Sequence, residues 1–259
     1  MSRTVLITGA AGRIGSALVK YLDSHDAPRY APRDAPRYAL RLADLEVAGE
    51  RGVALDVTDL SACRKACEGI DTVVHLAAVA SPDAPFDEIL PVNISGTYNV
   101  FRAASDAGVR RVVFASSAQA IEGYPLDVQV SSGMPVRPKN IYGVSKAFGE
   151  ALAAHFAYQQ GLEAVAVRIG AFEYPHEWKR MGARDLSAWV SPEDLCALLV
   201  RCIEADLGKE PFAIAHGISD NRFKRLDLTD TRARLGYAPT ADAFAVWQVG
   251  LCDTSEPVG

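Results

Sequence analysis

Short apolar runs alternate with longer segments of helical periodicity along the chain. Continuous or β-branched apolar runs predict strands at 4–8, 38–43, 52–56, 72–78, 111–115, 164–169 and 212–215. Apolar residues at helical spacing predict helices at 14–22, 60–68, 91–107, 142–160 and 192–203. The run at 72–78 is continuous, as expected for a strand that is buried on both faces. This alternation predicts an α/β fold with a Rossmann-type, doubly wound parallel sheet.

The same pattern divides the chain into two unequal parts. Residues 1–170 contain six of the expected strands and form the Rossmann domain. Residues 171–259 form a small C-terminal substrate-binding region, or lid, that is interleaved with the end of the sheet. Residues 27–38 repeat a tetrapeptide with a proline at every fourth position, which forbids a helix or a central strand and predicts an exposed loop insert.

Three glycines spaced three apart, Gly9, Gly12 and Gly15, join the first strand to the first helix. Gly9 permits a sharp turn, Gly12 lets backbone N–H groups approach an anion, and Gly15 allows close packing of the helix on the strand. The positive end of the helix then faces a diphosphate, with Arg13 and Ile14 in the same loop. The alternative is a glycine-rich loop without a ligand, but the strand before it and the helix after it favour a dinucleotide site.

The acidic residue that holds the adenosine ribose usually lies roughly 20 residues beyond such glycines. Asp44 ends the second strand 29 residues after Gly15. Without two copies of the four-residue repeat this spacing would be 21 residues, close to the usual value. A carboxylate there accepts hydrogen bonds from both ribose hydroxyls and repels a 2′-phosphate, so the sequence favours NAD over NADP. Arg41 leaves NADP possible as the cofactor, because a nearby arginine can accommodate the 2′-phosphate. If the Arg41 side chain points to the other face of the strand, it is structural instead.

The carboxyl ends of parallel strands meet at one edge of the sheet, where this fold binds its ligands. Gly9, Asp44, Asp56, Ala77 and Ser117 all fall at that edge. Asp56 is expected near an adenine amino group, and the small residues that end the fourth strand let the cofactor lie across the strand tips. The other cofactor contacts expected at this edge are Val57, Leu76, Ala78, Ser116 and Ile169.

Candidate chemistry lies in Ser117, at the end of the fifth strand, and in Tyr142 and Lys146, which share one face of a helix start. A free phenol has a pKa of about 10 and needs a neighbouring cation to favour the phenolate, and Lys146 supplies one. In this hypothesis Ser117 holds a substrate oxygen, Tyr142 removes its proton, and hydride passes from the carbon to nicotinamide. An isolated Tyr-x-x-x-Lys is more often a solvated helix start, but here the strand, the serines and the glycine loop stand in the expected order.

Composition narrows the classes of partner. The formal charge of −5 over 259 residues argues against nucleic acid or an anionic membrane as a partner. No apolar run is long enough to span a bilayer and the first strand starts too early for a signal peptide, so we expect a cytoplasmic protein. The five cysteines lack metal-ligand spacing and no metal is expected, while Cys63 and Cys67 are expected to be buried thiols on one helix.

These motifs resemble the short-chain dehydrogenase/reductase superfamily, in its extended branch, the NAD-dependent epimerase/dehydratase family. The resemblance covers residues 4 to about 170 and rests on Thr8 to Gly15, Asp56 to Asp59, His75 to Ala78, Asn93, Ser116-Ser117 and Tyr142 to Lys146. It implies an NAD-dependent enzyme in which Ser117, Tyr142 and Lys146 are the catalytic set. It also implies that Asn93 lies among the catalytic and cofactor-contacting residues and supports the lysine through water.

Within that family the chain looks most like the uronate dehydrogenases, on Leu40 to Leu45, Phe114 to Ser117, Tyr142 to Glu150, Val167 to Gly170, Arg180-Met181 and Trp189. Those enzymes oxidise a hexuronic acid at C1 with NAD to an aldarolactone, and the resemblance places Arg180 at the substrate carboxylate. The expected sugar contacts are Ala80, Ser81, Ser117, Ala118, Gln119, Tyr142, Ala171 and Arg180. Ala80, Ala118, Gln119 and Ala171 depart from the family pattern and remove partners for sugar hydroxyls, which leaves the identity of the sugar open.

Two other functions stay open. One is an NAD-dependent epimerase or reductase for another small polar substrate, although the short C-terminal region leaves no room to grip a nucleotide diphosphate. The other is a non-catalytic dinucleotide sensor, against which the intact Ser117, Tyr142 and Lys146 speak. The helices at 91–107 and 142–160 are apolar around much of their circumference, which predicts a second buried surface and therefore a homo-oligomer.

Overall fold

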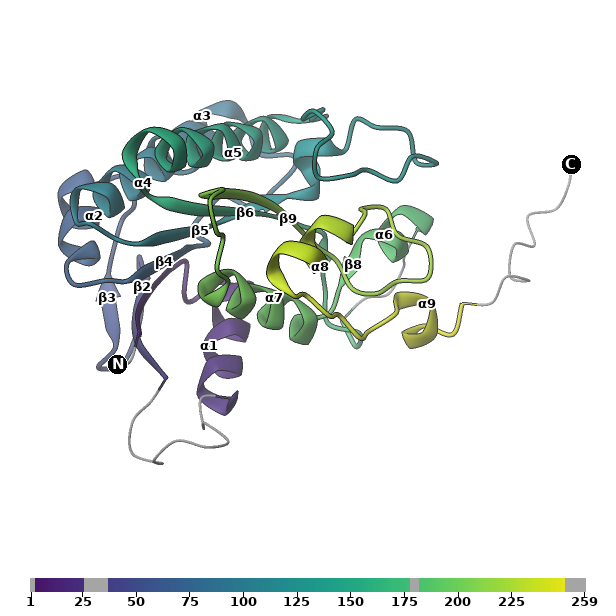
Figure 1. Ribbon diagram of the computed structural model, residues 1–259, viewed down its shortest axis with the longest axis horizontal. Helices are drawn as coiled ribbons and strands as arrows, with labels where there is room; N and C mark the ends of the chain where they lie inside the picture. The colour runs from purple at the N-terminus through teal and green to yellow at the C-terminus, as the bar shows by residue number, and fades with distance from the viewer. Residues whose placement is uncertain (1–2, 26–36, 178–181, 250–259) are drawn as a thin grey trace, which may run out of the picture.

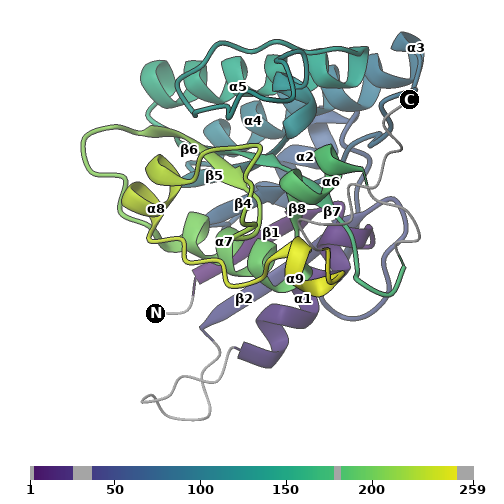
Figure 2. The same ribbon diagram turned by 90° about the vertical axis from the view of Figure 1, so that its right-hand side faces the viewer.

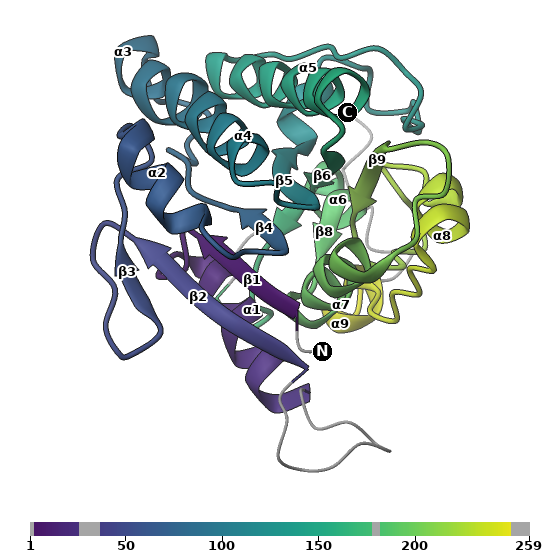
Figure 3. The same cartoon turned by 60° about the vertical axis from the view of Figure 1, so that its left-hand side comes forward.

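The computed structural model describes residues 3–25, 37–177 and 182–249 of the chain. Seven parallel strands form one sheet in the order β3-β2-β1-β4-β5-β6-β9, and Figure 3 shows β3 and β2 at one edge. Their bounds are β1 (Arg3–Thr8), β2 (Tyr38–Asp44), β3 (Gly52–Ala54), β4 (Thr72–His75), β5 (Arg111–Ser117), β6 (Glu163–Ile169) and β9 (Phe212–Gly217). The predicted doubly wound parallel sheet is therefore confirmed.

Helices cover both faces of the sheet (Figure 1). On one face α1 (Arg13–His25) packs beside α7 (Pro192–Glu204), and on the other α2 (Leu60–Cys67), α4 (Thr97–Asp106) and α5 (Ile141–Gln160) lie side by side. Successive residues of β5 point into the two resulting cores: Val113 packs under α1 and α7, whereas Val112 and Phe114 pack under α4 and α5. The central strands are continuously apolar because both of their faces are buried.

Capping side chains set the ends of the helices. Asn140 begins α5 because its side chain accepts a hydrogen bond from the backbone N–H of Gly143 at 2.7 Å. Gly161 ends α5 in the left-handed conformation, with φ of 72°. Asp59 caps α2 by accepting two backbone N–H groups of the first turn. The cap at Asn140 places Tyr142 in the first turn of α5, beyond the carboxyl ends of the strands.

The helical segment expected at 91–107 begins earlier than expected, at residue 86, and is divided into three parts. It comprises α3 (Phe86–Ile89), a π-helical segment η1 (Leu90–Gly96) and α4. A Cβ on Gly96 would lie 2.7 Å from Cγ2 of Val57, so glycine allows this wider turn to approach the end of β3. Wider turns of this kind occur frequently at functional sites. Here the turn carries Asn93, whose exposed fraction is only 2%.

The C-terminal residues are interleaved with the sheet. The strand β9 pairs with β6, and α7 completes the layer that α1 begins. The short strands β7 (Ala171–Phe172) and β8 (Trp189–Val190) form a separate parallel pair. Around Trp189 of this pair, α6 (Ala183–Ala188) and α9 (Ala243–Val246) close a small third core (Figure 2). The remaining helix, α8 (Thr229–Leu235), follows β9.

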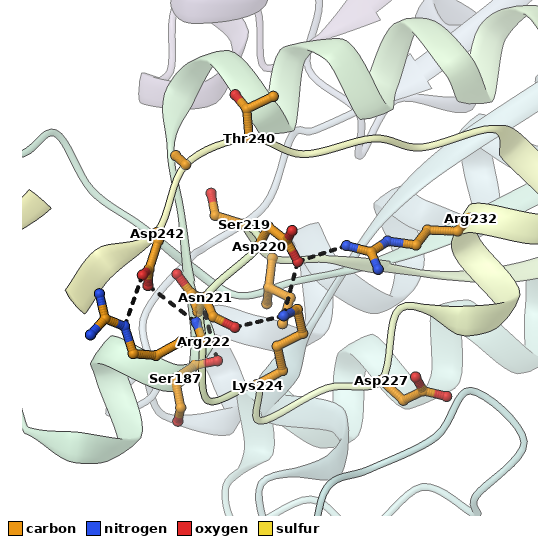
Figure 4. Close-up of polar contacts among 12 residues, drawn as sticks. Ser187, Ser219, Asp220, Asn221, Arg222, Lys224, Asp227, Arg232, Thr240 and Asp242 are labelled. Atoms are coloured by element: carbon orange, nitrogen blue, oxygen red, sulfur yellow. Dashed lines mark hydrogen bonds and ion pairs between the residues drawn. The ribbon is translucent and has the colours of Figure 1, made fainter. Parts of the chain in front are cut away.

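Charged side chains fix the segment after β9 (Figure 4). Lys224 and Arg232 both pair with Asp220, at 2.9 and 2.6 Å, and Arg222 pairs with Asp242 at 3.0 Å. These cations are therefore engaged in holding the segment in place.

The structure describes some of the remaining residues that the sequence analysis singled out, and others lie outside its described ranges. The repeat, apart from residues 37 and 38, lies outside the described residues, and so does Arg180. Cys63 and Cys67 are buried free thiols as predicted, and burial raises the pKa of each to about 12. Within the described ranges no helix combines the length and the apolar character needed to cross a bilayer.

Candidate active site

A cavity of about 790 Å³ runs along the carboxyl ends of the central strands, a volume typical of small-molecule sites. Most of the residues expected at the cofactor and the substrate line it. These are Gly9, Gly12, Arg13, Ile14, Gly15, Asp44, Asp56, Val57, Leu76, Ala77, Ala78, Ala80, Ser116, Ser117, Tyr142, Lys146 and Ile169. Five expected residues are not among those that line the cavity, namely Ser81, Asn93, Ala118, Gln119 and Ala171.

The glycine loop fits a diphosphate. Gly9 has φ of 70°, and a Cβ on it would come within 2.7 Å of the backbone nitrogen of Ala77. A Cβ on Gly15 would lie 2.2 Å from the carbonyl oxygen of Gly9. The loop and α1 therefore pack at a distance that only glycine permits. Because α1 begins at Arg13, its unpaired N–H groups and positive end face the cavity.

Asp44 ends β2 beside the glycine loop. Its Oδ2 accepts the backbone N–H of Ala11 at 2.9 Å and its Oδ1 accepts that of Leu45 at 2.8 Å. Each oxygen keeps acceptor capacity for a ribose hydroxyl. Arg41, which kept NADP open, donates instead to the carbonyls of Ala66 and Glu68 at 2.7 and 2.9 Å. Its guanidinium thus binds the end of α2, and the acidic site is typical of NAD.

Ser117, Tyr142 and Lys146 come together from β5 and α5. The Ser117 hydroxyl lies near the Tyr142 phenol and acts to lower its pKa. Nζ of Lys146 lies 5.5 Å from the ring centre of Tyr142 and 5.2 Å from that of Phe114. Ser117 also accepts the backbone N–H of Gln119 at 3.1 Å and so begins the short helix η2 (Ala118–Ile121). The structure thus brings the three expected catalytic side chains to one end of the cavity.

The electrostatics of these groups differ from the sequence expectation. Burial lowers the pKa of Lys146 to about 7. Burial raises the pKa of Tyr142, and the nearby Ser117 hydroxyl offsets this in part. The expected lowering of the phenol pKa is therefore absent in the protein alone, because burial disfavours the charged form of either group.

Asn93 contacts the backbone of the cavity wall. Its Oδ1 accepts the N–H of Val79 at 2.8 Å, and its Nδ2 donates to the carbonyl of Val79 at 3.0 Å and to Oγ of Ser145 at 3.1 Å. Among the described residues its amide therefore binds Val79 and Ser145 and not Lys146. Asn93 clamps the segment after β4 to the turn of α5 that carries the lysine.

A buried ion pair beside the site was missed by sequence reasoning. The Ser116 hydroxyl donates to Glu150 at 2.6 Å, and Glu150 accepts two hydrogen bonds from Arg168 at 2.9 and 2.8 Å. The two charged residues are 5% and 3% exposed. The pair joins α5 to β5 and β6. The signals in the sequence were that Glu150 lies four residues after Lys146, on the same helix face, and that Arg168 interrupts an apolar strand.

The segment after β6 completes the cavity wall. A Cβ on Gly170 would lie 1.9 Å from the carbonyl oxygen of Ala188, so glycine lets this turn pack against the end of α6. The chain then carries Phe172 and Glu173 to the cavity, and neither residue was singled out from the sequence.

Known proteins resemble this chain over most of its length. The family described as the NAD dependent epimerase/dehydratase family matches residues 5–192. The chain is 38% identical to an NAD-dependent glucose-6-phosphate dehydrogenase of Haloferax volcanii, over 92% of this chain and 94% of that protein. It is 37% identical to an L-arabinose 1-dehydrogenase (NAD(P)(+)) of the same organism, over 93% and 98%. A crystal structure of a uronate dehydrogenase mutant from Agrobacterium tumefaciens complexed with NAD has a TM-score of 0.78 and 32% identity, over 96% and 88%.

Proposed function

The chain belongs to the NAD-dependent epimerase/dehydratase family, and we propose that it oxidises a sugar or sugar acid at C1 to a lactone. The family resemblance and the NAD cofactor expected from the sequence are confirmed, and the chain is an NAD-dependent sugar dehydrogenase. The observation that supports the finer proposal is that Ser117, Tyr142 and Lys146 line the same cavity as the glycine loop.

In this reaction different residues of the chain bind the cofactor, bind the sugar and accept the proton. When bound, NAD accepts a hydride from the carbon that is oxidised. Backbone N–H groups of the glycine loop hold the diphosphate, and Asp44 holds the adenosine ribose. Ser117 hydrogen-bonds to the C1 oxygen and Tyr142 accepts its proton as general base, while the Lys146 ammonium stabilises the phenolate. Loss of the hydride from C1–H and of the proton from the C1 hydroxyl of a ring-closed sugar leaves C=O beside the ring oxygen, which is a lactone.

A panel of sugars tests the proposal. NADH formation is followed with galacturonate, glucuronate, L-arabinose, glucose 6-phosphate and neutral hexoses, and the product is identified by NMR. We expect NADH and a lactone with at least one of them. An isomerised sugar without net NADH would support the epimerase alternative. Measurable NAD binding without turnover of any sugar would support the dinucleotide-sensing alternative.

The anion anchor of a sugar acid is proposed to be Arg180, outside the described residues. The described arginine that follows it in the chain, Arg184, already makes two hydrogen bonds to Glu122 at 3.0 and 2.6 Å and one to Asp185 at 3.2 Å. Two carboxylates therefore occupy its guanidinium, which argues against Arg184 as the anchor.

Arg180→Ala is expected to raise KM for galacturonate by about tenfold or more, because a hydrogen bond between charged groups is worth about 1.5–3 kcal/mol. KM for neutral sugars is expected to stay unchanged. Initial rates with both sugar classes provide the measurement, and Lys179→Ala serves as the matched control for loss of a neighbouring cation. Equal changes in KM for acidic and neutral sugars would remove Arg180 as the carboxylate anchor.

We also propose that the protein self-associates in the cytoplasm through the face of α3, η1, α4 and α5. The exposed large apolar residues on this face are Phe86, Leu90, Tyr98, Ile141, Val144 and Tyr158. These exposed apolar side chains on neighbouring elements support the proposal, because extended apolar surface marks interaction sites. We expect gel filtration at micromolar concentration to show a dimer or larger species, and Tyr98→Glu with Val144→Glu to yield the monomer. Leu126→Glu, on an exposed loop, is the matched control, and a monomeric wild type would contradict the proposal.

A further inference from the structure

A cluster of ion pairs spans the solvent side of the cavity. Arg13, the first residue of α1, donates from Nη1 and Nη2 to the carboxylate of Glu173 at 3.4 and 2.8 Å. Its Nη2 also donates to Glu177 at 2.7 Å. Arg13 and Glu173 both line the cavity, although they lie 160 residues apart in the chain. Their side chains are 53% and 30% exposed, which places the contact at the solvent edge.

Fixed backbone holds both ends of this cluster. On one side Arg13 belongs to the glycine loop, in which the N–H of Gly12 donates to the carbonyl of Gly9 at 3.1 Å. On the other side the carbonyl of Glu173 accepts the indole N–H of Trp189 at 3.0 Å. Trp189 is 1% exposed, so this anchor is part of the core. A hydrogen bond thus fixes the backbone in each wall, and the side chains of Arg13, Glu173 and Glu177 meet between the walls.

One guanidinium and two carboxylates give the cluster a net charge of −1, so it offers a bound diphosphate no net electrostatic attraction. The hydrogen bond to Glu173 raises the pKa of Arg13, so the residue stays cationic. A guanidinium has five N–H groups. Three of these N–H groups donate to Glu173 and Glu177, and the other two do not contact the glutamates. The same loop carries the backbone N–H groups that face a diphosphate.

We propose that Glu173 and Glu177 hold Arg13 as a strap across the bound dinucleotide and thereby slow its release. The strap consists of these three side chains, and it joins the wall that starts α1 to the wall that follows β7. A dinucleotide lying along the strand tips has the strap between it and solvent, so the ion pairs must open before it leaves. Glu173 and Glu177 are then cofactor-retaining residues contributed by the C-terminal region. This inference concerns NADH release and does not depend on which sugar is oxidised.

Rates of NADH dissociation test the strap. The bound NADH is displaced with excess NAD in a stopped-flow fluorimeter, and equilibrium binding is measured in parallel. The double variant Glu173→Gln/Glu177→Gln is expected to release NADH about fivefold faster, which corresponds to about 1 kcal/mol. Arg13→Gln is expected to speed release at least as much, because it breaks the same ion pairs and also removes the guanidinium from the diphosphate loop. Adding both glutamine substitutions to Arg13→Gln is expected to cause no further increase, because the ion pairs are already broken. Added salt is expected to speed release from the wild type and to have little effect on the variants.

A matched control removes an ion pair elsewhere. Arg51 and Asp23 pair at 2.8 Å with 46% and 49% exposure, and neither lines the cavity. Arg51→Gln is therefore expected to release NADH at the wild-type rate, and thermal unfolding verifies that every variant is folded. An unchanged rate in the double glutamine variant would overturn the strap. So would tighter NADH binding by that variant together with weaker binding by Arg13→Gln, because the glutamates would then compete with the diphosphate for Arg13.

Discussion

Replacing Tyr142 with phenylalanine is expected to lower kcat for sugar oxidation by about 10³-fold, within the range of general base catalysis. The phenol is the proposed proton acceptor, and Tyr142 lines the cavity together with Ser117 and Lys146. NADH affinity is expected to stay close to that of the wild type, because the glycine loop and Asp44 carry the expected cofactor contacts. Initial rates and NADH fluorescence titrations measure the two quantities separately.

A second tyrosine supplies the control for Tyr142→Phe. Tyr124 donates its hydroxyl to the carbonyl of Pro135 at 2.9 Å and does not line the cavity. Tyr124→Phe therefore removes the same atom outside the site, and wild-type kcat is expected. If Tyr142→Phe retained most of its activity, Tyr142 would not be the proton acceptor, and the order of roles proposed for the site would be wrong.

The parts of the fold that depend on local sequence were predictable. Continuous apolar runs marked the strands because each central strand is buried on both faces. A residue that begins a helix, such as Asp59, acts within one turn of its own position. Parallel strands gather their carboxyl ends at one edge, so Gly9 and Ser117 were placed at the same cavity although they lie far apart in the chain.

The features that sequence reasoning missed depend on packing between distant segments. Arg13 contacts Glu173, which lies 160 residues later in the chain, and the hydrophobic periodicity of the sequence does not predict such a contact. Glu150 and Arg168 are charged residues that belong to the core only because they neutralise each other there. The π-helical turn around Asn93 interrupts a pattern that is otherwise helical. The pKa directions of Tyr142 and Lys146 follow from burial, which spacing along a helix does not reveal.

Lys146→Met is expected to inactivate the enzyme and to stabilise its fold at neutral pH. Burial lowers the pKa of this lysine from 10.5 to about 7, so the folded protein binds the proton less tightly than the unfolded chain does. The resulting destabilisation is complete below pH 7, declines as pH rises from about 7 to 10.5, and vanishes above that range. Methionine has a similar unbranched shape and carries no charge, so it avoids the cost of burying an ammonium group.

Urea unfolding of Lys146→Met and wild type at pH 7 and near pH 10 measures this difference. One pKa unit corresponds to about 1.4 kcal/mol, so the lowering from 10.5 to about 7 predicts a gain on the order of 5 kcal/mol at pH 7 and a much smaller one near pH 10. Lys20→Met, at an exposed position of α1, is the control, with an expected change within about 0.5 kcal/mol. A methionine variant less stable than the wild type at pH 7 would mean that the protein stabilises the ammonium. Stability gained together with activity lost would identify Lys146 as a charge that the fold maintains for the reaction.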